Sequence, residues 1–345
     1  MALLQVDDLQ VAFQTRKGKV RAVNGVSFSV EEGKTLALVG ESGSGKSVSA
    51  MSILRLLDEN GEIEGGEILF DEQGRGEAID LVKLPLDKMR EIRGNRISVV
   101  FQEPMTALNP VLSIGRQLSE PFIIHRGLHK KQARAAAVKM LEEVRIPNPE
   151  RVIGDYVHRL SGGMRQRVMI AMALACAPKL LIADEPTTAL DVTIQAQILS
   201  LMKGLQEENG TAILFITHDL GVVNEMADDV AVMYCGRVVE LAKKSAVFGN
   251  GRYSHPYTEG LLRSAPSQKT AGKRLESIAG NVPSLFNLPK GCKFAPRCKY
   301  CTEKCIAEEP PLFTTKSGQK IRCFYPKKEE RRSDEHAKLV VRRPS

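Results

Sequence analysis

Hydrophobic and polar residues alternate over residues 2–33, with the period of two that is typical of β-strands with one buried face. A polar stretch at 14–19 interrupts the alternation and predicts a loop between two antiparallel strands. Strand-like sequence returns at 62–70. The N-terminal part of the chain is therefore predicted to form an antiparallel β-subdomain.

Several short hydrophobic runs have the length and composition of strands that are buried on both faces. They lie at 35–39, 97–101, 180–183, 212–217 and 230–234. Helix-like segments separate them, including one from about 46 to 57 and a mainly helical region from about 110 to 176. Strands that alternate with helices predict an α/β fold whose sheet is largely parallel and is covered on both faces.

A change in composition near residue 250 marks the predicted end of the main domain. Beyond it, prolines and glycines break up every regular pattern. We expect a main domain at 1–248, a small loop-rich extension at 249–326 and a basic, flexible tail at 327–345. The extension can bury too little hydrophobic area to be stable without an additional cross-link, such as a bound metal.

Composition narrows the class of protein. The chain has 345 residues, 43% of them hydrophobic and 26% charged, which excludes a wholly disordered or fibrous chain. The most hydrophobic stretch, 168–183, is interrupted at Pro178 after about ten residues, whereas a membrane-spanning helix needs about 20. No secretory signal is recognisable, so we expect a cytosolic location. The net charge of +8 weakly favours an anionic partner: a nucleotide, a nucleic acid or an anionic membrane face.

The strongest motif is a glycine-rich loop of the form G-x-x-x-x-G-K-[ST] between a predicted strand and a predicted helix. Its glycines let backbone N–H groups turn toward phosphate oxygens. Its lysine brings a positive charge to the β- and γ-phosphates, and its last hydroxyl is a ligand for Mg²⁺. The sequence therefore predicts a nucleotide site at Gly40, Glu41, Ser42, Gly43, Ser44, Gly45, Lys46 and Ser47.

Two acidic residues end the hydrophobic run at 180–183. A buried strand would bring Asp184 and Glu185 to the same edge of the sheet as the glycine-rich loop. Asp184 is then placed to hold the Mg²⁺ shell, and Glu185 to orient or deprotonate the attacking water. In combination with the loop, these two carboxylates predict hydrolysis of the nucleotide.

A third motif, at residues 160–166, precedes a long hydrophobic helix. Ser161, Gly162 and Gly163 offer a hydroxyl and backbone N–H groups that could hold a second phosphate. A single phosphate loop does not need this second anion site, so the segment suggests action on the nucleotide of another subunit. Taken alone, it is more simply interpreted as a helix N-cap with flexible glycines.

These motifs, in this order and spacing, resemble the ATP-binding cassette of ABC transporters over about residues 4–245. The resemblance implies a P-loop ATPase with a RecA-like parallel core, an N-terminal antiparallel subdomain and a helical subdomain at about 105–176. It also implies two cassettes that meet head to tail, with each ATP between Lys46 of one subunit and the Ser161 segment of the other.

Further site residues follow from the same resemblance. Gln102 would sense the γ-phosphate and Mg²⁺, and His218 would contact the γ-phosphate. Asp191 would act across the dimer interface. Phe13 is the candidate for stacking under the adenine, with a core role as the alternative.

Residues 101–110 and the sequence from His255 onward resemble the ATPases of oligopeptide, dipeptide and nickel importers. The implied function is ATP hydrolysis that drives import of peptides, or of nickel or another small solute, at the cytoplasmic face of the inner membrane. The implied partners are a second ATPase subunit, expected to be a paralogue, two membrane permeases that dock on about 103–160, and an extracytoplasmic substrate-binding protein, with no nucleic acid. A non-transport ABC ATPase is the remaining alternative. It is disfavoured because no long coiled coil separates Ser47 from Ser161.

Five of the seven cysteines lie within 292–323, which in a cytosolic protein predicts a metal site before disulfides. Four thiolates suit either Zn²⁺ or an iron–sulfur cluster. The importer resemblance implies a [4Fe–4S] cluster on Cys292, Cys298, Cys305 and Cys323, and Cys301 is then either a spare thiol or a substitute ligand. Nearby bases would offset the negative charge of such a cluster: Lys290, Lys293, Arg297 and Lys299.

Overall fold

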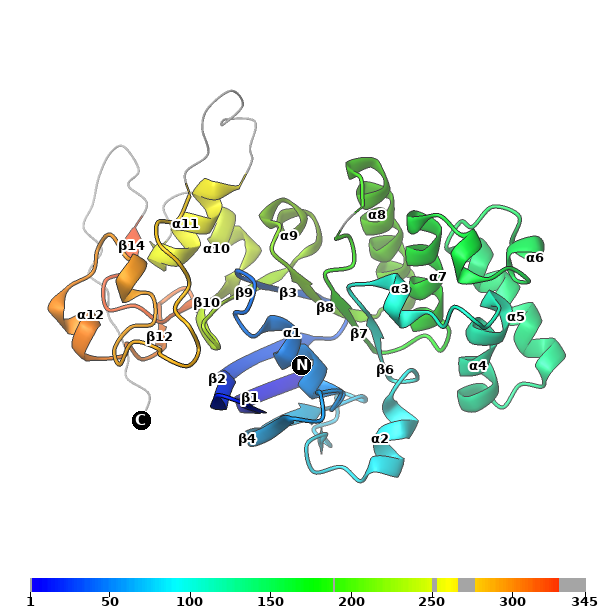
Figure 1. The fold of residues 1–345 in the computed structure, drawn as a ribbon, viewed down its shortest axis with the longest axis horizontal. Helices are drawn as coiled ribbons and strands as arrows, with labels where there is room; N and C mark the ends of the chain where they lie inside the picture. The colour runs from blue at the N-terminus through cyan, green and yellow to red at the C-terminus, as the bar shows by residue number, and fades with distance from the viewer. Residues whose placement is uncertain (1, 189, 250–252, 266–276, 329–345) are drawn as a thin grey trace. The chain divides into compact units, whose positions relative to one another are not determined.

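The computed structural model describes residues 2–188, 190–249, 253–265 and 277–328, which belong to two compact units (Figure 1). The first unit comprises Met1–Leu4, Val30–Thr35 and Leu69–Ile216, and the second comprises Gln5–Ser29, Leu36–Ile68 and Thr217–Ser345. Apart from its first two residues, the tail predicted at 327–345 lies outside the described residues. In the described ranges no helix is both long and apolar enough to span a bilayer.

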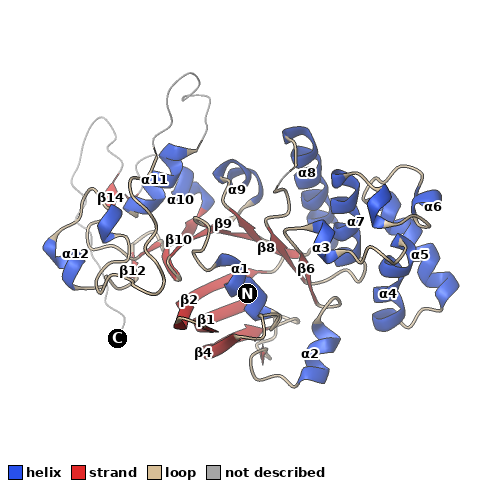
Figure 2. Ribbon diagram, viewed as in Figure 1, coloured by secondary structure: helices blue, strands red, loops and turns tan. Residues whose placement is uncertain are grey.

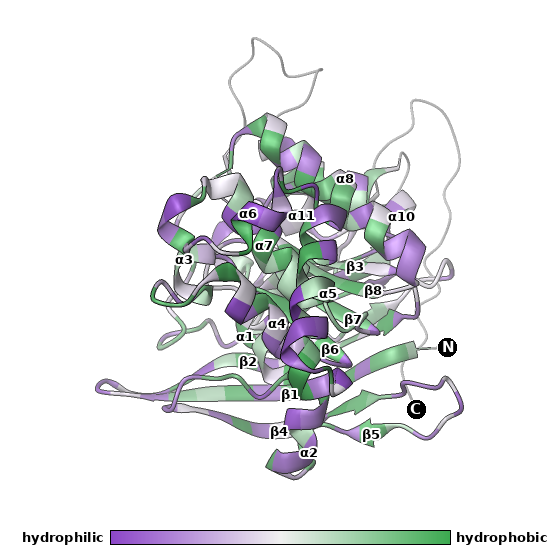
Figure 3. Ribbon diagram, turned by 90° about the vertical axis from the view of Figure 1, so that its right-hand side faces the viewer, coloured by the Kyte–Doolittle hydropathy of each residue, from purple (hydrophilic) through white to green (hydrophobic). Residues whose placement is uncertain are grey.

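The first unit is built on three parallel strands. β7 (Leu180–Asp184) pairs with β6 (Ile97–Val100) on one side and with β8 (Ala212–Thr217) on the other. All residues of β7 and β8 are buried, which explains their continuous hydrophobic sequence (Figure 3). The three hydrophobic runs predicted as strands are confirmed here.

Helices make up most of the remaining first unit, and the region predicted to be mainly helical is confirmed. Helices α4, α5 and α7 pack against one another, and Ser113 caps α4 by accepting from the Arg116 N–H. The helices are α2 (Leu86–Ile92), α3 (Pro104–Ala107), α4 (Ile114–Arg126), α5 (Lys130–Glu143), α6 (Pro149–Val152), α7 (Gly162–Leu174) and α8 (Val192–Asn209), with the 3₁₀ turn η1 (Val157–Arg159) before α7.

The second unit contains a five-strand stretch of sheet in the order β12-β13-β10-β9-β3. β3 (Thr35–Val39) runs parallel to β9 (Asp229–Tyr234), and both were predicted. β10 (Arg237–Lys243), β13 (Lys320–Ile321) and β12 (Phe313–Thr314) continue the sheet antiparallel and were not predicted. The C-terminal extension therefore contributes two strands to the sheet that holds β3.

The antiparallel β-subdomain predicted at the N-terminus is confirmed, with strands in the order β2-β1-β4-β5. β1 (Ala2–Thr15) and β2 (Gly18–Glu31) are longer than predicted, so the connection shrinks to residues 16–17. β4 (Gly61–Phe70) ends in the first unit, where Leu69 and Phe70 pair with β5 (Ile79–Asp80).

Short helices complete the second unit, joined in the extension by loops (Figure 2). The helix predicted over 46–57 ends earlier, at Ile53, because Leu54 leaves the helical conformation and Arg55 has a φ of 52°. The elements are α1 (Lys46–Ile53), α9 (Leu220–Met226), α10 (Lys244–Phe248), β11 (Tyr253–Ser254), α11 (Pro256–Ser264), the 3₁₀ turn η3 (Ala295–Arg297), α12 (Glu303–Ala307) and β14 (Lys327–Lys328), which pairs with β11.

One hydrophobic cluster joins the sheet of the second unit to the extension. Val39 and Val232 on the sheet belong to the same buried cluster as Tyr257 and Phe294 of the extension. The Phe294 ring lies 5.3 Å from that of Tyr234 and 5.4 Å from that of Tyr257, measured between ring centroids. Such aromatic pairs bury large areas and add about 0.5–1.5 kcal/mol each. The extension thus shares the core of the sheet that it follows in sequence.

Replacing Phe294 by alanine should lower the free energy of unfolding of this unit by about 3–5 kcal/mol, since its side chain is 3% exposed and the cavity would form inside the shared cluster. The urea midpoint measures the effect. The matched control is Phe286→Ala, because Phe286 is 52% exposed and its removal should change the free energy of unfolding by no more than about 0.5 kcal/mol. Equal midpoints for the two variants would contradict the shared core.

Candidate functional site

The phosphate loop begins where β3 ends, and its shape depends on glycine. Gly40 has a φ of 152°, and a Cβ there would lie 2.2 Å from the Met233 carbonyl oxygen. Gly45 has a φ of 99°, and its Cβ would lie 2.7 Å from the Ala22 carbonyl oxygen. Neither position can accept a side chain without a shift of backbone. The loop therefore curls tightly before α1 begins at Lys46.

Lys46 folds back into the loop. Its side chain is 5% exposed, and its Nζ donates to the carbonyl oxygens of Gly40, at 2.9 Å, and Glu41, at 3.1 Å. The buried Ser44 Oγ has no hydrogen-bond partner among the described residues. A buried ammonium group and a buried hydroxyl at the start of a helix are groups that can bind an anionic ligand. The predicted phosphate-binding residues are thus brought together.

Glu41 makes two contacts with the extension that the sequence analysis did not predict. Its N–H donates to Tyr257 Oη at 2.8 Å, and its carboxylate accepts two hydrogen bonds from Arg297, at 2.6 and 2.9 Å. The bidentate geometry is the strong form of an arginine–carboxylate pair. Two residues of the extension therefore hold the second residue of the phosphate loop.

Glu185 follows the buried Asp184 at the end of β7 in a strained conformation. Its φ of 46° lies in the left-handed region, which is unfavourable for a residue with a Cβ. The Glu185 N–H donates to the Ile216 carbonyl oxygen at 2.9 Å, which fixes the turn against the neighbouring strand β8. The strain therefore sets the direction in which the Glu185 carboxylate leaves the strand.

Two side chains hold the Glu185 carboxylate. Gln102 Nε2 donates to Oε2 at 3.2 Å, and Thr188 Oγ1 donates to the same oxygen at 2.9 Å. Gln102 follows β6, so the parallel pairing of β6 and β7 brings it to Glu185. The predicted pair Gln102 and Glu185 is thus placed together, whereas Thr188 was not predicted as a site residue.

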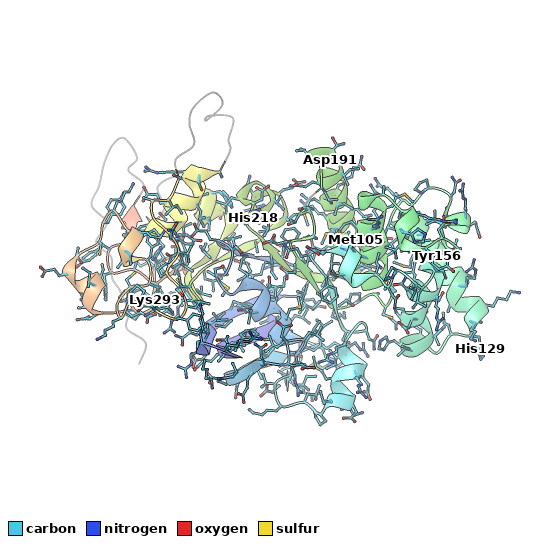
Figure 4. The ribbon with its side chains drawn as sticks, viewed as in Figure 1. Met105, His129, Tyr156, Asp191, His218 and Lys293 are labelled. Carbon is cyan, nitrogen blue, oxygen red and sulfur yellow. The ribbon has the colours of Figure 1, made fainter. Side chains whose placement is uncertain are left out.

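Ser161 and Asp191 both cap helices of the first unit. Ser161 Oγ accepts from the Met164 N–H at 3.4 Å at the start of α7, and Asp191 Oδ1 accepts from the Ile194 N–H at 2.9 Å at the start of α8 (Figure 4). Ser161 and Gly162 are exposed, and Gly163 is half-buried. The helix-cap interpretation of the Ser161 segment is therefore observed, and its N-terminus is open to a ligand.

His218 and Phe13 belong to the second unit. His218 follows β8 and is exposed, one residue before the Asp219 cap of α9 (Figure 4). Phe13 lies on β1 and is half-buried, with its ring so close to Gly61 that a Cβ on Gly61 would meet it at 2.7 Å. The Phe13 ring is thus partly covered by the protein and partly exposed.

Four of the five clustered cysteines line one pocket. Cys292, Cys298, Cys305 and Cys323 surround a space of about 350 Å³, its open mouth included, while Cys301 is not part of this lining. The backbone fixes the first and third of these residues, because the Cys292 N–H donates to the Cys305 carbonyl oxygen at 2.8 Å. The spacing of the cysteines therefore brings together the four residues that the importer resemblance implied.

Burial disfavours the charged form of three thiols that line this pocket. Burial raises the pKa of Cys292 to about 11 and that of Cys323 to about 12, and it also raises the pKa of Cys298. In the described part of the chain, no group of three or more His, Cys, Asp or Glu side chains is arranged to hold a metal ion. A bound metal would have to draw these thiols together and deprotonate them.

The bases near the cysteines have other partners. Arg297 pairs with Glu41, Lys293 Nζ lies 3.2 Å from Glu309 Oε2, and Lys299 Nζ lies 3.4 Å from Glu259 Oε1. From the sequence, these residues were expected to offset the negative charge of an iron–sulfur cluster. Of the three, Arg297 has the partner that matters for the nucleotide site.

Comparisons with known families agree with the two parts of the sequence. Residues 23–188 match the ABC transporter family. Residues 239–305 match the oligopeptide/dipeptide transporter C-terminal region. The second match lies on the segment that carries Tyr257, Arg297 and three of the four pocket cysteines.

Similarity to named relatives extends over nearly the whole chain. The oligopeptide transport ATP-binding protein AppD of Bacillus subtilis is 52% identical, over 93% of this chain and 96% of that protein. OppD of Haemophilus influenzae is 49% identical, over 93% and 97%. OppD of Salmonella typhimurium is 48% identical, over 95% of each.

Solved ATP-binding cassettes share the fold. The cassette MJ0796, in a dimeric structure with ADP and phosphate, has a TM-score of 0.62 and is 29% identical over 70% of this chain and 98% of that one. CbiO1 of Clostridium perfringens, part of an ABC transporter complex, has a TM-score of 0.59 and is 30% identical over 72% and 90%. Together with a phosphate loop that holds a buried lysine, these likenesses show that the chain belongs to the family of ATP-hydrolysing subunits of ABC importers that carry the oligopeptide/dipeptide C-terminal region.

Proposed function

We propose that this protein hydrolyses ATP to ADP and phosphate in order to drive the import of di- or oligopeptides through an ABC transporter. The geometry of the phosphate loop carries the proposal, because the loop curls around the buried Lys46, whose Nζ donates to the carbonyl oxygens of Gly40 and Glu41. The match of residues 239–305 to the peptide-transporter C-terminal region supports the peptide cargo. So do the names of relatives that are about half identical.

ATP would bind by replacing the internal partners of the loop. Lys46 exchanges the carbonyl oxygens of Gly40 and Glu41 for oxygens of the β- and γ-phosphates, while the N–H groups of Gly43, Gly45 and their neighbours donate to the same phosphates. Ser47 and Asp184 would hold Mg²⁺, which when bound neutralises phosphate charge. The proposed ligand set of the metal also includes Gln102.

Hydrolysis would depend on the Glu185 carboxylate. Gln102 and Thr188 donate to its Oε2, and we assign the carboxylate to orient the attacking water or to accept its proton. We assign His218 to the γ-phosphate, where a donor stabilises charge that develops as the bond to the leaving group breaks. The contribution of the protein is then positioning and electrostatic stabilisation rather than covalent chemistry.

A second cassette would complete each site. The exposed N-terminus of α7, with Ser161, Gly162 and Gly163, offers N–H groups and a favourable helix potential to the ATP of the partner. Asp191, exposed at the start of α8, would act across the same interface. Phe13 would stack under the adenine. Because Ser161 and Gly162 are exposed, this end of α7 can receive an anion from another molecule.

The proposed setting is the cytoplasmic face of the inner membrane. Family membership implies a complex with membrane permeases. We propose two permease subunits that dock on about 103–160, a second ATPase subunit that is a paralogue, and an extracytoplasmic substrate-binding protein. We assign ATP binding to a domain at 1–248 and the peptide-importer extension to 249–326.

The four-cysteine pocket is proposed to hold a [4Fe–4S] cluster, with Zn²⁺ as the alternative. The fit rests on donor chemistry: four thiols, and no fifth cysteine, line one pocket between aromatic and proline side chains in the described extension. A cluster would supply a covalent staple to a module with little regular structure. Its residues would be Cys292, Cys298, Cys305 and Cys323.

Replacing Lys46 by alanine should weaken MgATP binding by at least about 100-fold, because the buried positive charge contacts two phosphate groups in the proposed complex. Titration of a fluorescent ATP analogue into the full-length protein measures the dissociation constant. The control is Lys203→Ala on the exposed face of α8, which should leave the constant unchanged. Undiminished ATP affinity in the Lys46 variant would refute the role of the loop.

Replacing Glu185 by glutamine should preserve ATP binding but slow steady-state hydrolysis by about 10²–10⁴-fold, since the amide can orient water but cannot accept its proton. The assay is phosphate release by the assembled transporter. The slow hydrolysis should be accompanied by accumulation of a closed ATP-bound dimer. Glu207→Gln, an exposed acid on α8, is the matched control. Wild-type turnover by the Glu185 variant would exclude the proposed base.

Replacing Cys292 by serine should remove most of the bound metal from protein purified without oxygen and should lower the melting temperature of the extension. Serine is a poor ligand for iron or zinc, so the cross-link that the bound metal forms between the cysteines would be lost. Elemental analysis measures iron and zinc. Cys301→Ser is the matched control, because Cys301 does not line the pocket. Equal metal loss in both variants would contradict the proposed ligand set.

A further inference from the structure

We propose that Arg297 and Tyr257, two residues of the C-terminal extension, are positioning residues that hold the phosphate loop in its ATP-binding shape through Glu41. The inference rests on the proposed function, in which this loop binds the phosphates of ATP. It adds a role for the extension in the affinity for ATP. Neither residue is expected to touch the nucleotide.

Every polar group of Glu41 is engaged. Its carboxylate accepts from Arg297 Nη1 and Nη2 at 2.6 and 2.9 Å, and its N–H donates to Tyr257 Oη at 2.8 Å. Its carbonyl oxygen accepts from Lys46 Nζ at 3.1 Å. A single residue therefore joins the extension to the lysine that the phosphates are proposed to contact. Any rotation of Glu41 would have to break contacts on both sides.

Arg297 is itself fixed in place. Its side chain is 3% exposed, its Nε donates to the Ala279 carbonyl oxygen at 3.1 Å, and its guanidinium carbon lies 5.8 Å from the centre of the Tyr234 ring and 5.9 Å from that of Phe294. A guanidinium held on two aromatic faces loses little further freedom when it binds a carboxylate. Arg297 thus acts as a rigid support rather than a mobile surface charge.

Tyr257 supplies the second support from the buried core. It is 0% exposed, and its ring centroid lies 4.6 Å from that of Tyr234. The hydroxyl reaches the Glu41 N–H from this fixed ring, so that this amide is turned to the extension and not into the loop. The orientation of one peptide unit of the loop is therefore set by a core residue 216 positions later in the chain.

Fixing the loop before ATP arrives should raise affinity. A loop that is ordered only on binding loses conformational freedom at that moment, and the loss is subtracted from the binding free energy. Releasing Glu41 would therefore raise the dissociation constant of MgATP. AMP, which lacks the phosphates that Lys46 is proposed to contact, should be affected far less.

The test compares full-length variants by the dissociation constants of MgATP and AMP and by melting temperature. Arg297→Gln and Glu41→Gln should each weaken MgATP binding by about tenfold, equal to about 1.4 kcal/mol. The double variant should be no weaker than either single variant, because both remove the same interaction. Arg297→Lys keeps the charge and should restore part of the affinity. Tyr257→Phe keeps the buried ring, so the protein should fold, and should weaken MgATP binding by about threefold.

Arg263→Gln is the matched control. Arg263 Nη2 lies 2.6 Å from Glu259 Oε1 within α11, so the variant loses an ion pair of the same extension that does not involve Glu41. Its MgATP affinity should equal that of the wild type. If Arg297→Gln and Tyr257→Phe lower the melting temperature but leave MgATP affinity within twofold, the contacts only attach the extension and the inference is overturned. Additive losses in the double variant would overturn it as well.

Lys46→Ala in the same series separates this inference from the proposed function. If that variant loses MgATP while Arg297→Gln keeps it, the site is correct and the positioning role is wrong. If Lys46→Ala binds MgATP as the wild type does, the loop is not the nucleotide site and both proposals fail.

Discussion

The close approach of Gly40 to the carbonyl of Met233 is the constraint on which the nucleotide site depends. Only a residue without a Cβ can lie this close to the Met233 carbonyl oxygen. The close approach lets the chain turn sharply at the end of β3. The turn brings the carbonyl oxygens of residues 40 and 41 within reach of Lys46. The loop is therefore assembled before any ligand arrives, by a packing condition on the neighbouring strand β9.

A comparable arrangement holds the Glu185 carboxylate, which is proposed to act in hydrolysis, in the other unit. There a parallel strand pair brings Gln102 to Glu185, and a left-handed backbone turn sets the direction of the carboxylate. In both places a buried hydrophobic strand ends abruptly and the next residue has a positive φ, which Gly40 adopts freely and Glu185 adopts only with strain. The rigid strands on either side hold these turns in place. The proposed site residues therefore have a fixed geometry although they lie on turns.

Elements with local signals could be predicted from the sequence, and elements that depend on distant partners could not. β3 and β6 to β9 are continuous hydrophobic runs, and the phosphate loop is a contiguous motif. β10 was not predicted because it contains Glu240, a fully buried residue whose carboxyl group accepts hydrogen bonds from the His255 N–H and from Gln319 Nε2, 79 positions later. The contact of Glu41 with Arg297 spans 256 positions, and no sequence pattern near either residue predicts it.

The hydrophobic cluster shared by the sheet and the extension has a consequence for evolution by recombination. A module joined by a linker can be exchanged between proteins as a unit, whereas this extension supplies core residues to Val39 and Tyr234 on strands outside it. A gene that lost the extension would encode a cassette whose hydrophobic cluster is exposed to solvent. Its Glu41 would also have lost the hydrogen bonds from Arg297. Gain or loss of the module therefore requires coordinated substitutions in the preceding domain, so the two segments should be inherited together.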